Sequence, residues 1–472
     1  MSARRVIPAK GVRVSQPNIV LIIADHFRPD FITPAYTPNL TALAADGVCF
    51  ASAYCAAPLC QPSRNCIITG QFPSQHGVCG NQTPPIMAQL RDDTFMSRLQ
   101  RGGYHTALVG KHHYIDRYGI GMDITDDDEE LKSYGFDDVL QVCDDGENQH
   151  NDDRYTQYLA SNGMLETFRS EYKTGTAAYR HPFEADDTAD GFIGRKGIDF
   201  VRNWSGEGPF YLNIGFIGPH PPYWHPGELE FDPQEMTPPL GVPDSANTRE
   251  RRAHFAQKCR LIDRYVGDLR TALAEKKLAE NTVIIFTSDH GDCLGDFGIW
   301  DKRFFYEQSV GVPLIMAGPG VPRGERMNGP RVCRHLVSHV DLYPTITALA
   351  GADEGPPPAD SSPRLDRRAG MDLRAAFDAT GPDLRRAVFA ELGTAVMVRT
   401  AGWKLVYDAE QGGVSYLYNL RNDPHELHNL AGVAGYEAVS AELVETILSH
   451  RIGLTQFTHA KEEQRFQRVR AG

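Results

Sequence analysis

Cys60 begins the segment of this chain whose residue types are best suited to covalent chemistry. The segment reads Cys60-Gln-Pro-Ser-Arg64. Pro62 is typical of the first turn of a helix, where its missing N–H group would have had no partner. Free N–H groups and the positive end of the helix dipole lower the pKa of a thiol and favour a bound anion. A cysteine at a helix start can also be purely structural, so this segment alone leaves both interpretations open.

Three other polar sites each come directly after a short apolar segment. They are Asp25, His220 and the segment Ser288-Asp-His-Gly291. Continuous apolarity over the length of a strand is typical of a strand that is buried on both faces of a parallel sheet. Ligands of such sheets bind beyond the carboxyl ends of the strands. We therefore expect these polar side chains to gather at one edge of a sheet.

Apolar segments of strand length alternate with amphipathic ones, which predicts an α/β fold with a large, mostly parallel sheet between helices. The Pro-rich, charged segment 351–370 is interpreted as a surface loop or linker. Closely spaced short strands and a helix over about 436–450 then predict a small antiparallel α+β subdomain. The predicted domains are 1–383 and 384–472, the second with a polar tail. Expected strands lie at 18–24, 210–216, 282–287 and 312–316, and expected helices at 94–101, 187–204, 253–277 and 340–350.

The charge balance limits the ligands that this chain can attract. Its 472 residues include 48 Lys and Arg against 61 Asp and Glu, a formal net charge of −13, and 41% are hydrophobic. The hydrophobic content excludes a disordered chain, and the net charge argues against a nucleic acid partner, which requires a basic face. A ligand that is an anion would need a local positive pocket. The acidic segment 123–130 is expected to be a solvated loop.

Several features argue against a membrane protein or a secreted one. The longest apolar segment, 19–24, is far shorter than the roughly 20 residues that span a bilayer. Residues 1–17 lack the apolar region of a signal peptide, so we expect a cytoplasmic protein with no membrane partner. The nine cysteines are an odd number without paired spacing, which indicates reduced thiols. The polar tail 455–472 could lie across a second subunit, so a homo-oligomer is possible.

The segment from Cys60 continues to Thr69-Gly70 and Pro73, and this longer pattern resembles the signature of type I sulfatases. In that family the cysteine is oxidised after translation to formylglycine. The resemblance implies the fold of the alkaline-phosphatase superfamily, with a large α/β domain and a small four-stranded one, in agreement with the pattern of apolar segments. Further segments resemble the family in the same order, namely 18–25, 109–113, 218–222, 287–302, 306–316 and 418–426.

The resemblance implies a covalent mechanism for this chain. Cys60 would be the formylglycine precursor, whose hydrated aldehyde supplies an oxygen nucleophile. Loss of a proton from its second hydroxyl group would then release the sulfate and restore the aldehyde. Arg64, one helical turn further on, would pair with the diol and support its ionised form. A formylglycine-generating maturation enzyme is implied as a partner.

The resemblance also implies one divalent metal, with Asp25, Asp289 and His290 as ligands. At position 26 many sulfatases have a second Asp, and relatives acting on phosphonate monoesters or choline sulfate tend to have Gln, whereas this chain has His26. We expect the His26 ring to point inward as a fourth ligand, which makes Mn²⁺ competitive with Ca²⁺. If the ring pointed outward it would only support a ligand through a hydrogen bond, and Ca²⁺ or Mg²⁺ would be equally suitable.

Five further residues match substrate-binding or catalytic positions of the family. Lys111, His113 and Lys302 would hold the oxygens of the sulfuryl group, with His113 also near the diol. His220 would donate a proton to the leaving oxygen. Asn81 would reach the substrate anion, by similarity to relatives that hydrolyse phosphonates. The two lysines and the metal would supply the positive pocket that an acidic chain requires.

The predicted function is hydrolysis of a small sulfate monoester, with release of inorganic sulfate and an alcohol or phenol. The alternative is a phosphonate monoester hydrolase or phosphodiesterase with the same nucleophile. Lys111 and His113 favour sulfate, because the phosphonate-cleaving relatives tend to place Tyr and Thr in that segment. A non-catalytic protein that binds an anion is a remote alternative, since every core position is retained. Candidate residues of the substrate pocket are Tyr114, Tyr223, Trp224, His225 and Arg303.

Overall fold

The architecture centres on an eight-stranded sheet, in a computed structural model that describes residues 16–116, 119–174, 179–324, 331–352, 368–377 and 383–455. The strand order is β5-β4-β6-β1-β7-β8-β2-β9. Strand β1 runs parallel to both β6 and β7, and β8 is antiparallel to its neighbours β7 and β2. The strands are β1 (Asn18–Asp25), β2 (Val48–Phe50), β4 (His105–Gly110), β5 (Asp138–Gln141), β6 (Phe210–Pro219), β7 (Thr282–Ser288), β8 (Leu314–Ala317) and β9 (Arg331–Cys333).

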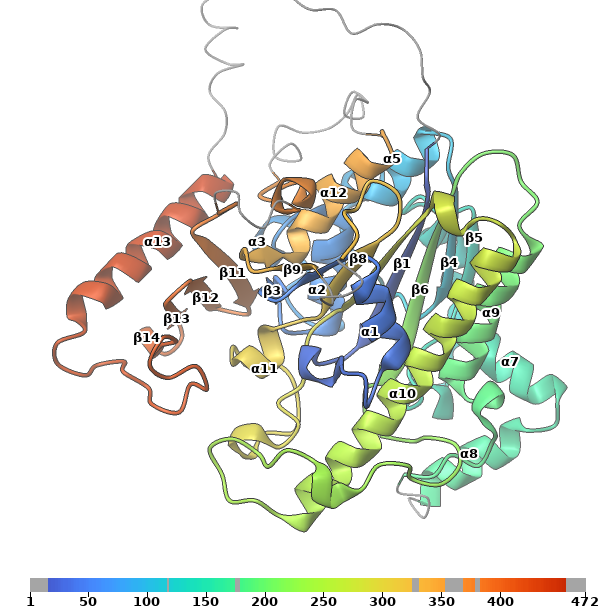
Figure 1. The fold of residues 1–472 in the computed structure, drawn as a ribbon, viewed down its shortest axis with the longest axis horizontal. Coiled ribbons are helices and arrows are strands. Elements are labelled where there is room, and N and C mark those ends of the chain that lie inside the picture. Colours follow the sequence, from blue (N-terminus) through green and yellow to red (C-terminus); the bar gives the residue numbers. More distant parts are fainter. Residues whose placement is uncertain are drawn as a thin grey trace, which may run out of the picture.

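Helices cover both faces of this sheet (Figure 1). Val20 and Ile22 of β1 pack toward α1, α9 and α10, whereas Ile19 and Leu21 pack toward α2, α5 and α12. This division explains why β1 is apolar at successive positions rather than at every second one. The covering helices are α1 (Pro38–Ala45), α2 (Cys60–Thr69), α5 (Phe95–Arg101), α9 (Ala189–Asn203), α10 (Ala246–Glu275) and α12 (Leu342–Leu349).

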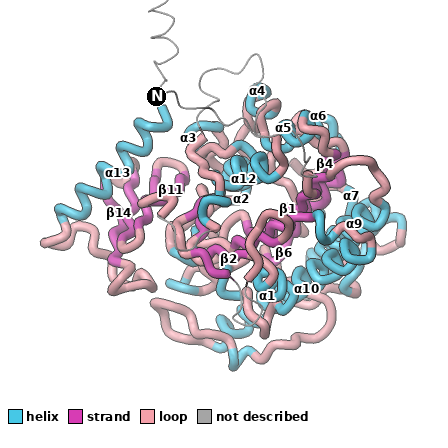
Figure 2. Tube along the Cα trace, turned by 45° about the horizontal axis from the view of Figure 1, so that its top comes forward, coloured by secondary structure: helices cyan, strands magenta, loops and turns pink. Residues whose placement is uncertain are grey.

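The C-terminal subdomain is a four-stranded antiparallel sheet with one helix, α13 (Glu437–Thr455), on one face (Figure 2). Leu405 packs against Leu443 and Ile447 of α13, whereas the next residue, Val406, packs toward the large domain. Successive side chains of a strand point to opposite faces, so one face of the small sheet packs on α13 and the other packs on the core of the large domain. The strands are β11 (Ala387–Leu392), β12 (Ala395–Thr400), β13 (Trp403–Asp408) and β14 (Gly413–Asn419).

The remaining elements are short and connect the main layers.

The mostly parallel sheet and the antiparallel subdomain confirm the predicted fold class. No described helix is both long and apolar enough to cross a bilayer. The shorter elements are β3 (Ala53–Tyr54), β10 (Val337–Ser338), α3 (Pro73–His76), α4 (Ala88–Arg91), α6 (Asp128–Lys132), α7 (Arg154–Ser161), α8 (Leu165–Thr174) and α11 (Glu307–Val310).

One local prediction was wrong. The acidic segment 123–130 is helical, because it forms a 3-10 turn over Ile124–Asp127 and the start of α6. Arg154 lies 2.6 Å from Asp128, and this neighbouring cation reduces the repulsion between the carboxylates. Residues 353–367 of the predicted linker and 456–472 of the polar tail lie outside the described residues, and the domain boundary at 383 stays a prediction.

A buried ion cluster joins the small sheet to the large domain. The side chain of Lys404 on β13 is fully buried, and its Nζ lies 2.7 Å from Glu307 and 2.6 Å from Glu426. Lys404 also donates to the carbonyl oxygen of Phe305 at 2.9 Å. The backbone N–H of Glu307 in turn donates to the Glu426 carboxylate at 2.7 Å. The cluster therefore ties β13 to residues 305–307 of the large domain.

Replacing Lys404 by methionine should destabilise the protein strongly. Lys404→Met removes the cation and leaves two carboxylates buried without its charge, so we expect a loss of about 3–5 kcal/mol in the free energy of unfolding. Urea denaturation measures the loss. Lys132→Met is the control, because Lys132 forms an exposed ion pair with Glu129 and its loss should change little. Equal unfolding midpoints for the two variants would contradict the role of the cluster.

Candidate functional site

The carboxyl ends of three adjacent strands bring the chemical residues to one edge of the large sheet. Asp25 is the last residue of β1, His220 directly follows β6, and Asp289 directly follows β7. Because β6, β1 and β7 are neighbours and run parallel, these positions converge. The gathering expected from the apolar segments is therefore present in the fold.

Cys60 reaches this edge as the first residue of α2. Pro62 lies in the first turn, and every residue of the helix is buried. The helix ends at Gly70, which has the left-handed φ of 65°. A Cβ atom there would lie 2.9 Å from the Tyr343 side chain, so glycine suits this position for two reasons. The helix start predicted from Pro62 is thus observed, with the thiol inside the protein.

Four side chains form a compact group of possible metal ligands. One ligand atom from each of Asp25, His26, Cys60 and His290 lies within 4.8 Å of all the others. The Cys60 Sγ is 3.1 Å from His290 Nε2, and the rings of His26 and His290 meet edge to face at 4.6 Å between centroids. All four residues are buried. The His26 ring therefore points inward, while its ligation of a metal stays a prediction.

The protonation of His26 follows from its two neighbours. Its Nδ1 lies 2.8 Å from the Asp292 carboxylate, and its Nε2 lies 2.6 Å from Lys302 Nζ. Burial and Lys302 lower the pKa of His26, but the hydrogen bond to Asp292 raises it to about 9. The lysine ammonium beside Nε2 can only donate, however, so the geometry makes Nε2 an acceptor and places the ring proton on Nδ1. The hydrogen bond from His26 holds the pKa of Asp292 at about 2, although burial would raise it. A neutral imidazole is the form that binds metals.

Asp289 lies beside the four-residue group rather than within it. Its Oδ2 accepts from Arg64 Nε at 2.8 Å, and its Oδ1 accepts from the backbone N–H of His290 at 2.9 Å. Oδ1 is also 3.7 Å from His290 Nε2. Arg64 donates further to the carbonyl oxygen of Lys111 at 3.0 Å. These hydrogen bonds orient Asp289 and the segment that carries Lys111, and the expected pairing of Arg64 with the diol stays a prediction.

Two lysines bring positive charge to the nucleophile. Lys111 forms ion pairs with Asp25 and, at 2.6 Å, with Asp144. Burial would raise the pKa of Cys60, but the charges of Lys302, His290 and Lys111 hold it well below its usual value. Burial and the Cys60 thiolate would likewise raise the pKa of Asp25, and the positive charge of Lys111 outweighs them. The site thus has the local positive charge that the acidic chain requires.

The two histidines with expected catalytic roles differ in charge. Burial would lower the pKa of His113, but hydrogen bonds to Asp116 and Cys60 raise it to about 9. Burial lowers the pKa of His220 to about 3, helped by Lys302. His220 Nδ1 donates to the carbonyl oxygen of Pro221 at 2.6 Å, so its Nε2 accepts from Lys302 at 3.2 Å. His220 is therefore a neutral ring whose Nε2 lone pair points toward the ammonium group of Lys302.

A cavity of about 430 Å³ adjoins this cluster. Asn81 lines it, and its Oδ1 accepts the N–H of Gln61 in the first turn of α2 at 3.1 Å. The cavity adjoins the side of the nucleophile that His113 borders, because Leu59 and His113 both line it. It is lined by Leu59, Gly80, Asn81, Gln82, His113, Asp116, Asp144, Glu147 and Arg303.

Of the five candidate pocket residues, only Arg303 lines this cavity. Tyr114 is buried in the core, where its hydroxyl group accepts from Asn213 at 2.9 Å. Tyr223 and Trp224 are buried in the core on the other face of the sheet, and His225 bonds His254 at 2.7 Å. The pocket prediction for these four was wrong, because residues next to a motif residue in sequence point in different directions.

Three carboxylates at the site were missed by sequence reasoning. Asp292 holds His26, Asp144 holds Lys111, and Asp116 holds His113. Asp292 lies three residues after Asp289 and Asp116 three residues after His113, so local spacing could have indicated both. Asp144 comes from a loop after β5, and nothing in the sequence near Lys111 indicates it.

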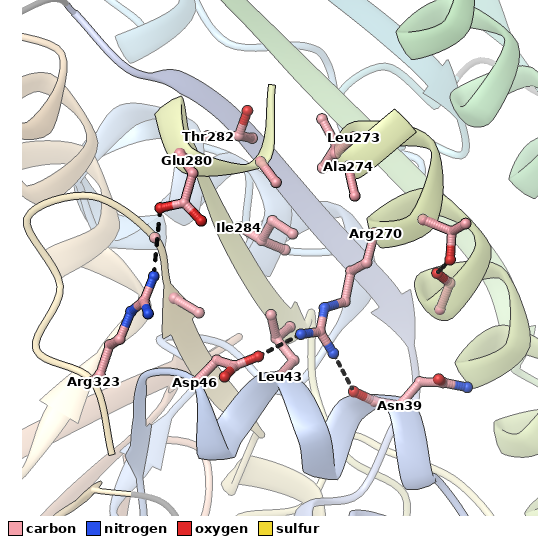
Figure 3. A pocket seen from close by; sticks show the side chains of 15 residues that line it. Asn39, Leu43, Asp46, Arg270, Leu273, Ala274, Glu280, Thr282, Ile284 and Arg323 are labelled. Carbon is pink, nitrogen blue, oxygen red and sulfur yellow. Dashed lines mark hydrogen bonds and ion pairs between the residues drawn. The ribbon is translucent and has the colours of Figure 1, made fainter. Parts of the chain in front are cut away.

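A larger cavity, of about 540 Å³, lies at the opposite end of the sheet, and its lining side chains are drawn in Figure 3. Thr282, the first residue of β7, lines it, so it is remote from the carboxyl ends that carry the nucleophile. Its two arginines are matched by carboxylates, with Arg270 2.5 Å from Asp46 and Arg323 3.5 Å from Glu280 (Figure 3). Its charges are therefore paired within the protein.

Comparison with known proteins gives the family. Residues 17–352 match the sulfatase family, and the chain belongs to it. A choline-sulfatase of Rhizobium meliloti (strain 1021) is 30% identical, over 88% of this chain and 82% of the relative. An arylsulfatase of Clostridium perfringens (strain 13 / Type A) is 27% identical, over 89% of this chain and 92% of the relative. The resemblance noted in the motifs is therefore confirmed across most of the chain.

Solved structures show the same fold. The phosphonate monoester hydrolase of Agrobacterium radiobacter superposes with a TM-score of 0.76 at 24% identity, over 93% of this chain and 96% of that one. The enzyme of the same name from Silicibacter pomeroyi gives 0.73 at 23% identity, over 94% and 97%. This likeness establishes the alkaline-phosphatase-like fold.

The carboxylate behind His26 should control metal affinity. Asp292→Asn keeps the size of the side chain but removes the charge that fixes the His26 proton on Nδ1, so we expect about tenfold or more weaker metal binding. Competition with a chelator, followed by elemental analysis, measures the affinity. Asp301→Asn is the control. It removes the same charge from an exposed carboxylate that is only loosely paired with Lys302, at 4.0 Å. Unchanged affinity in Asp292→Asn would show that His26 is not a ligand.

Proposed function

We propose that this protein hydrolyses sulfate monoesters, releasing inorganic sulfate and an alcohol or phenol. The observation that carries the proposal is the position of Cys60, which begins a buried helix inside a group of metal-ligand side chains and beside two lysines. The relatives named choline-sulfatase and arylsulfatase support the sulfate class. The nucleophile is formylglycine, made from Cys60 by a maturation enzyme.

The donor set fits one divalent metal held by Asp25, His26, Asp289 and His290. The ammonium group of Lys111 lies against Asp25 and that of Lys302 against Nε2 of His26, so positive charge already meets these atoms. Two imidazoles make the set softer than an all-oxygen cage, so Mn²⁺ competes with Ca²⁺ and Mg²⁺. When bound, the metal supplies Lewis acidity to the oxygens of the nucleophile and the substrate.

The residues of the chain bind the transferring group and hold the nucleophile. Lys111, Lys302 and His113 carry the positive charge that meets the sulfuryl oxygens, where preorganised cations act most strongly. Asn81 lines the same entrance and caps the helix that presents the nucleophile. Arg64 orients Asp289 from within that helix.

The leaving oxygen receives its proton from the pair formed by Lys302 and His220. His220 Nε2 accepts from the ammonium group at 3.2 Å, so the pair holds a proton at the place where the departing alkoxide needs one. The carbonyl oxygen of Pro221 fixes the other ring nitrogen as a donor and so keeps Nε2 directed at the site.

A phosphonate monoester hydrolase or phosphodiesterase would use the same residues. The structures with that name share the fold at under 25% identity, whereas the sulfatase relatives are similar over most of their sequences. The pair of Lys111 and His113 also favours sulfate. A side-by-side kinetic comparison of aryl sulfate, alkyl sulfate, phosphonate monoester and phosphodiester substrates tests the choice. A higher kcat/KM for the phosphorus substrates would overturn it.

Active protein should carry formylglycine at position 60. We expect mass spectrometry of the peptide that contains this residue to show the aldehyde, and Cys60→Ala to lose activity by about a thousandfold or more. Cys79→Ala is the control, because Cys79 is an exposed cysteine outside the cluster. Full activity with unmodified cysteine at position 60 would disprove the mechanism.

The effect of removing His220 should depend on the leaving group. His220→Ala is expected to slow alkyl sulfate hydrolysis by about a hundredfold or more, and nitrophenyl sulfate hydrolysis much less, because a good leaving group needs little protonation. Steady-state kinetics over a series of leaving groups measures the slope. His425→Ala, at an exposed histidine, should leave the slope unchanged. Equal losses across the series would remove His220 from this role.

A further inference from the structure

A second cavity, of about 370 Å³, lies where the small sheet meets the large domain. Its walls come from residues 303–306, which directly follow Lys302, and from the ends of β12, β13 and β14. It is therefore built from both sheets of the protein. The proposed mechanism does not use this cavity, although Tyr306 and Tyr418 in its wall begin two of the segments that resemble the family.

Aromatic rings form much of its wall. Phe304, Tyr306, Tyr416 and Tyr418 all line it. The Tyr306 centroid is 6.1 Å from that of Tyr416 and 6.2 Å from that of Tyr418, and the rings of Tyr416 and Tyr418 stack at 6.0 Å. Phe297 stacks on Tyr306 at 4.0 Å and so supports it. These side chains present aromatic surface to whatever occupies the cavity.

Two carboxylates accompany the rings. Asp408 and Glu410 line the same cavity, and no Lys, Arg or His in the described part of the chain forms an ion pair with either one. The Asp408 Oδ1 accepts from the hydroxyl group of Thr394 at 2.9 Å and from the N–H of Glu410 at 3.0 Å, which fixes its direction. Aromatic faces together with negative charge are the surroundings that bind organic cations, quaternary ammonium groups above all.

Arg303 connects this cavity to the candidate active site. It lines both cavities, it is exposed, and it forms no ion pair with any residue that the structure describes. Its backbone adopts the left-handed φ of 77°, and its N–H donates to the carbonyl oxygen of Pro58 at 3.0 Å. The chain thus turns sharply between Lys302, which faces the nucleophile, and the aromatic wall. The positively charged site around Lys302 therefore lies next to the aromatic cavity with its two carboxylates.

We propose that the aromatic cavity binds a cationic organic group of the substrate, so that the preferred substrate is the sulfate ester of an alcohol that carries an alkylammonium group. This inference rests on the proposed sulfatase function. The sulfate end meets the two lysines and Arg303, and the ammonium end meets the tyrosine rings and Asp408. Glu147, a further carboxylate that lines the first cavity, favours the same cation along its path.

Binding of a cation without any turnover tests the cavity directly. Phenyltrimethylammonium is the probe and tert-butylbenzene, a neutral molecule of the same shape, is its control. We expect calorimetry to show binding of the cation only, weakened about tenfold in Tyr416→Leu and in Asp408→Asn. Tyr407→Leu is the matched control variant, because Tyr407 packs toward α13 on the opposite face of the same sheet. Equal binding of the cation by all of these variants would overturn the proposal.

Turnover separates this inference from the proposed function. A trimethylammonioalkyl sulfate is compared with the neutral sulfate ester in which a tert-butyl group replaces the ammonium group. We expect a higher kcat/KM for the cationic ester, and a KM in Tyr416→Leu that rises more for the cationic ester than for the neutral one. Equal hydrolysis of both esters by the wild type would overturn the inference and leave the sulfatase function intact. Cation binding without hydrolysis of any sulfate ester would support the cavity and contradict the function.

Discussion

The negative charge of Asp25, at the end of the central strand, is the constraint on which the site depends. A fully buried carboxylate without a partner would cost several kcal/mol, so positive charge must be brought to it. Lys111 forms that ion pair, and Arg64 lies 3.6 Å away. Lys111 follows β4 and Arg64 lies in α2, so balancing one charge requires both elements to dock at the same edge of the sheet. The same docking places Cys60 beside Asp25.

The charges around Asp25 form a chain of pairs in which every member has a second partner. Lys111 also contacts Asp144, and Arg64 also contacts Asp289. Removing one of these charged side chains therefore leaves the charge of its partner buried and uncompensated, which is the most costly way to break a buried ion pair. This arrangement holds the nucleophile rigidly, as a site that acts by preorganised electrostatics requires.

The central strands and the helix start were predictable because their signals are local. Continuous apolarity identified β1, and Pro62 marked the start of α2. The direction of β8 was not predictable, since a short apolar segment of this kind carries no information about whether it runs parallel or antiparallel. The position of Asp144 and the wall formed by Tyr416 depend on contacts between distant segments, which spacing cannot reveal. Tyr114 was a candidate for the pocket because it adjoins His113 in sequence, but its side chain is buried in the core and bonds Asn213 of the neighbouring strand β6, a contact that spacing does not reveal.

The segment 302–307 unites these features, because six consecutive residues serve the nucleophile, the second cavity and the domain junction. Lys302 contacts His26, Tyr306 lines the aromatic cavity, and Glu307 lies in the buried ion cluster of Lys404. Both contacts lie within six residues of one another, so one short segment is anchored to the small sheet at Glu307 and to the site at Lys302. The attachment of the small sheet at this segment makes it a wall of the second cavity. If that cavity takes part of the substrate as proposed, substrate preference can change in the small sheet while the chemistry at Cys60 is retained.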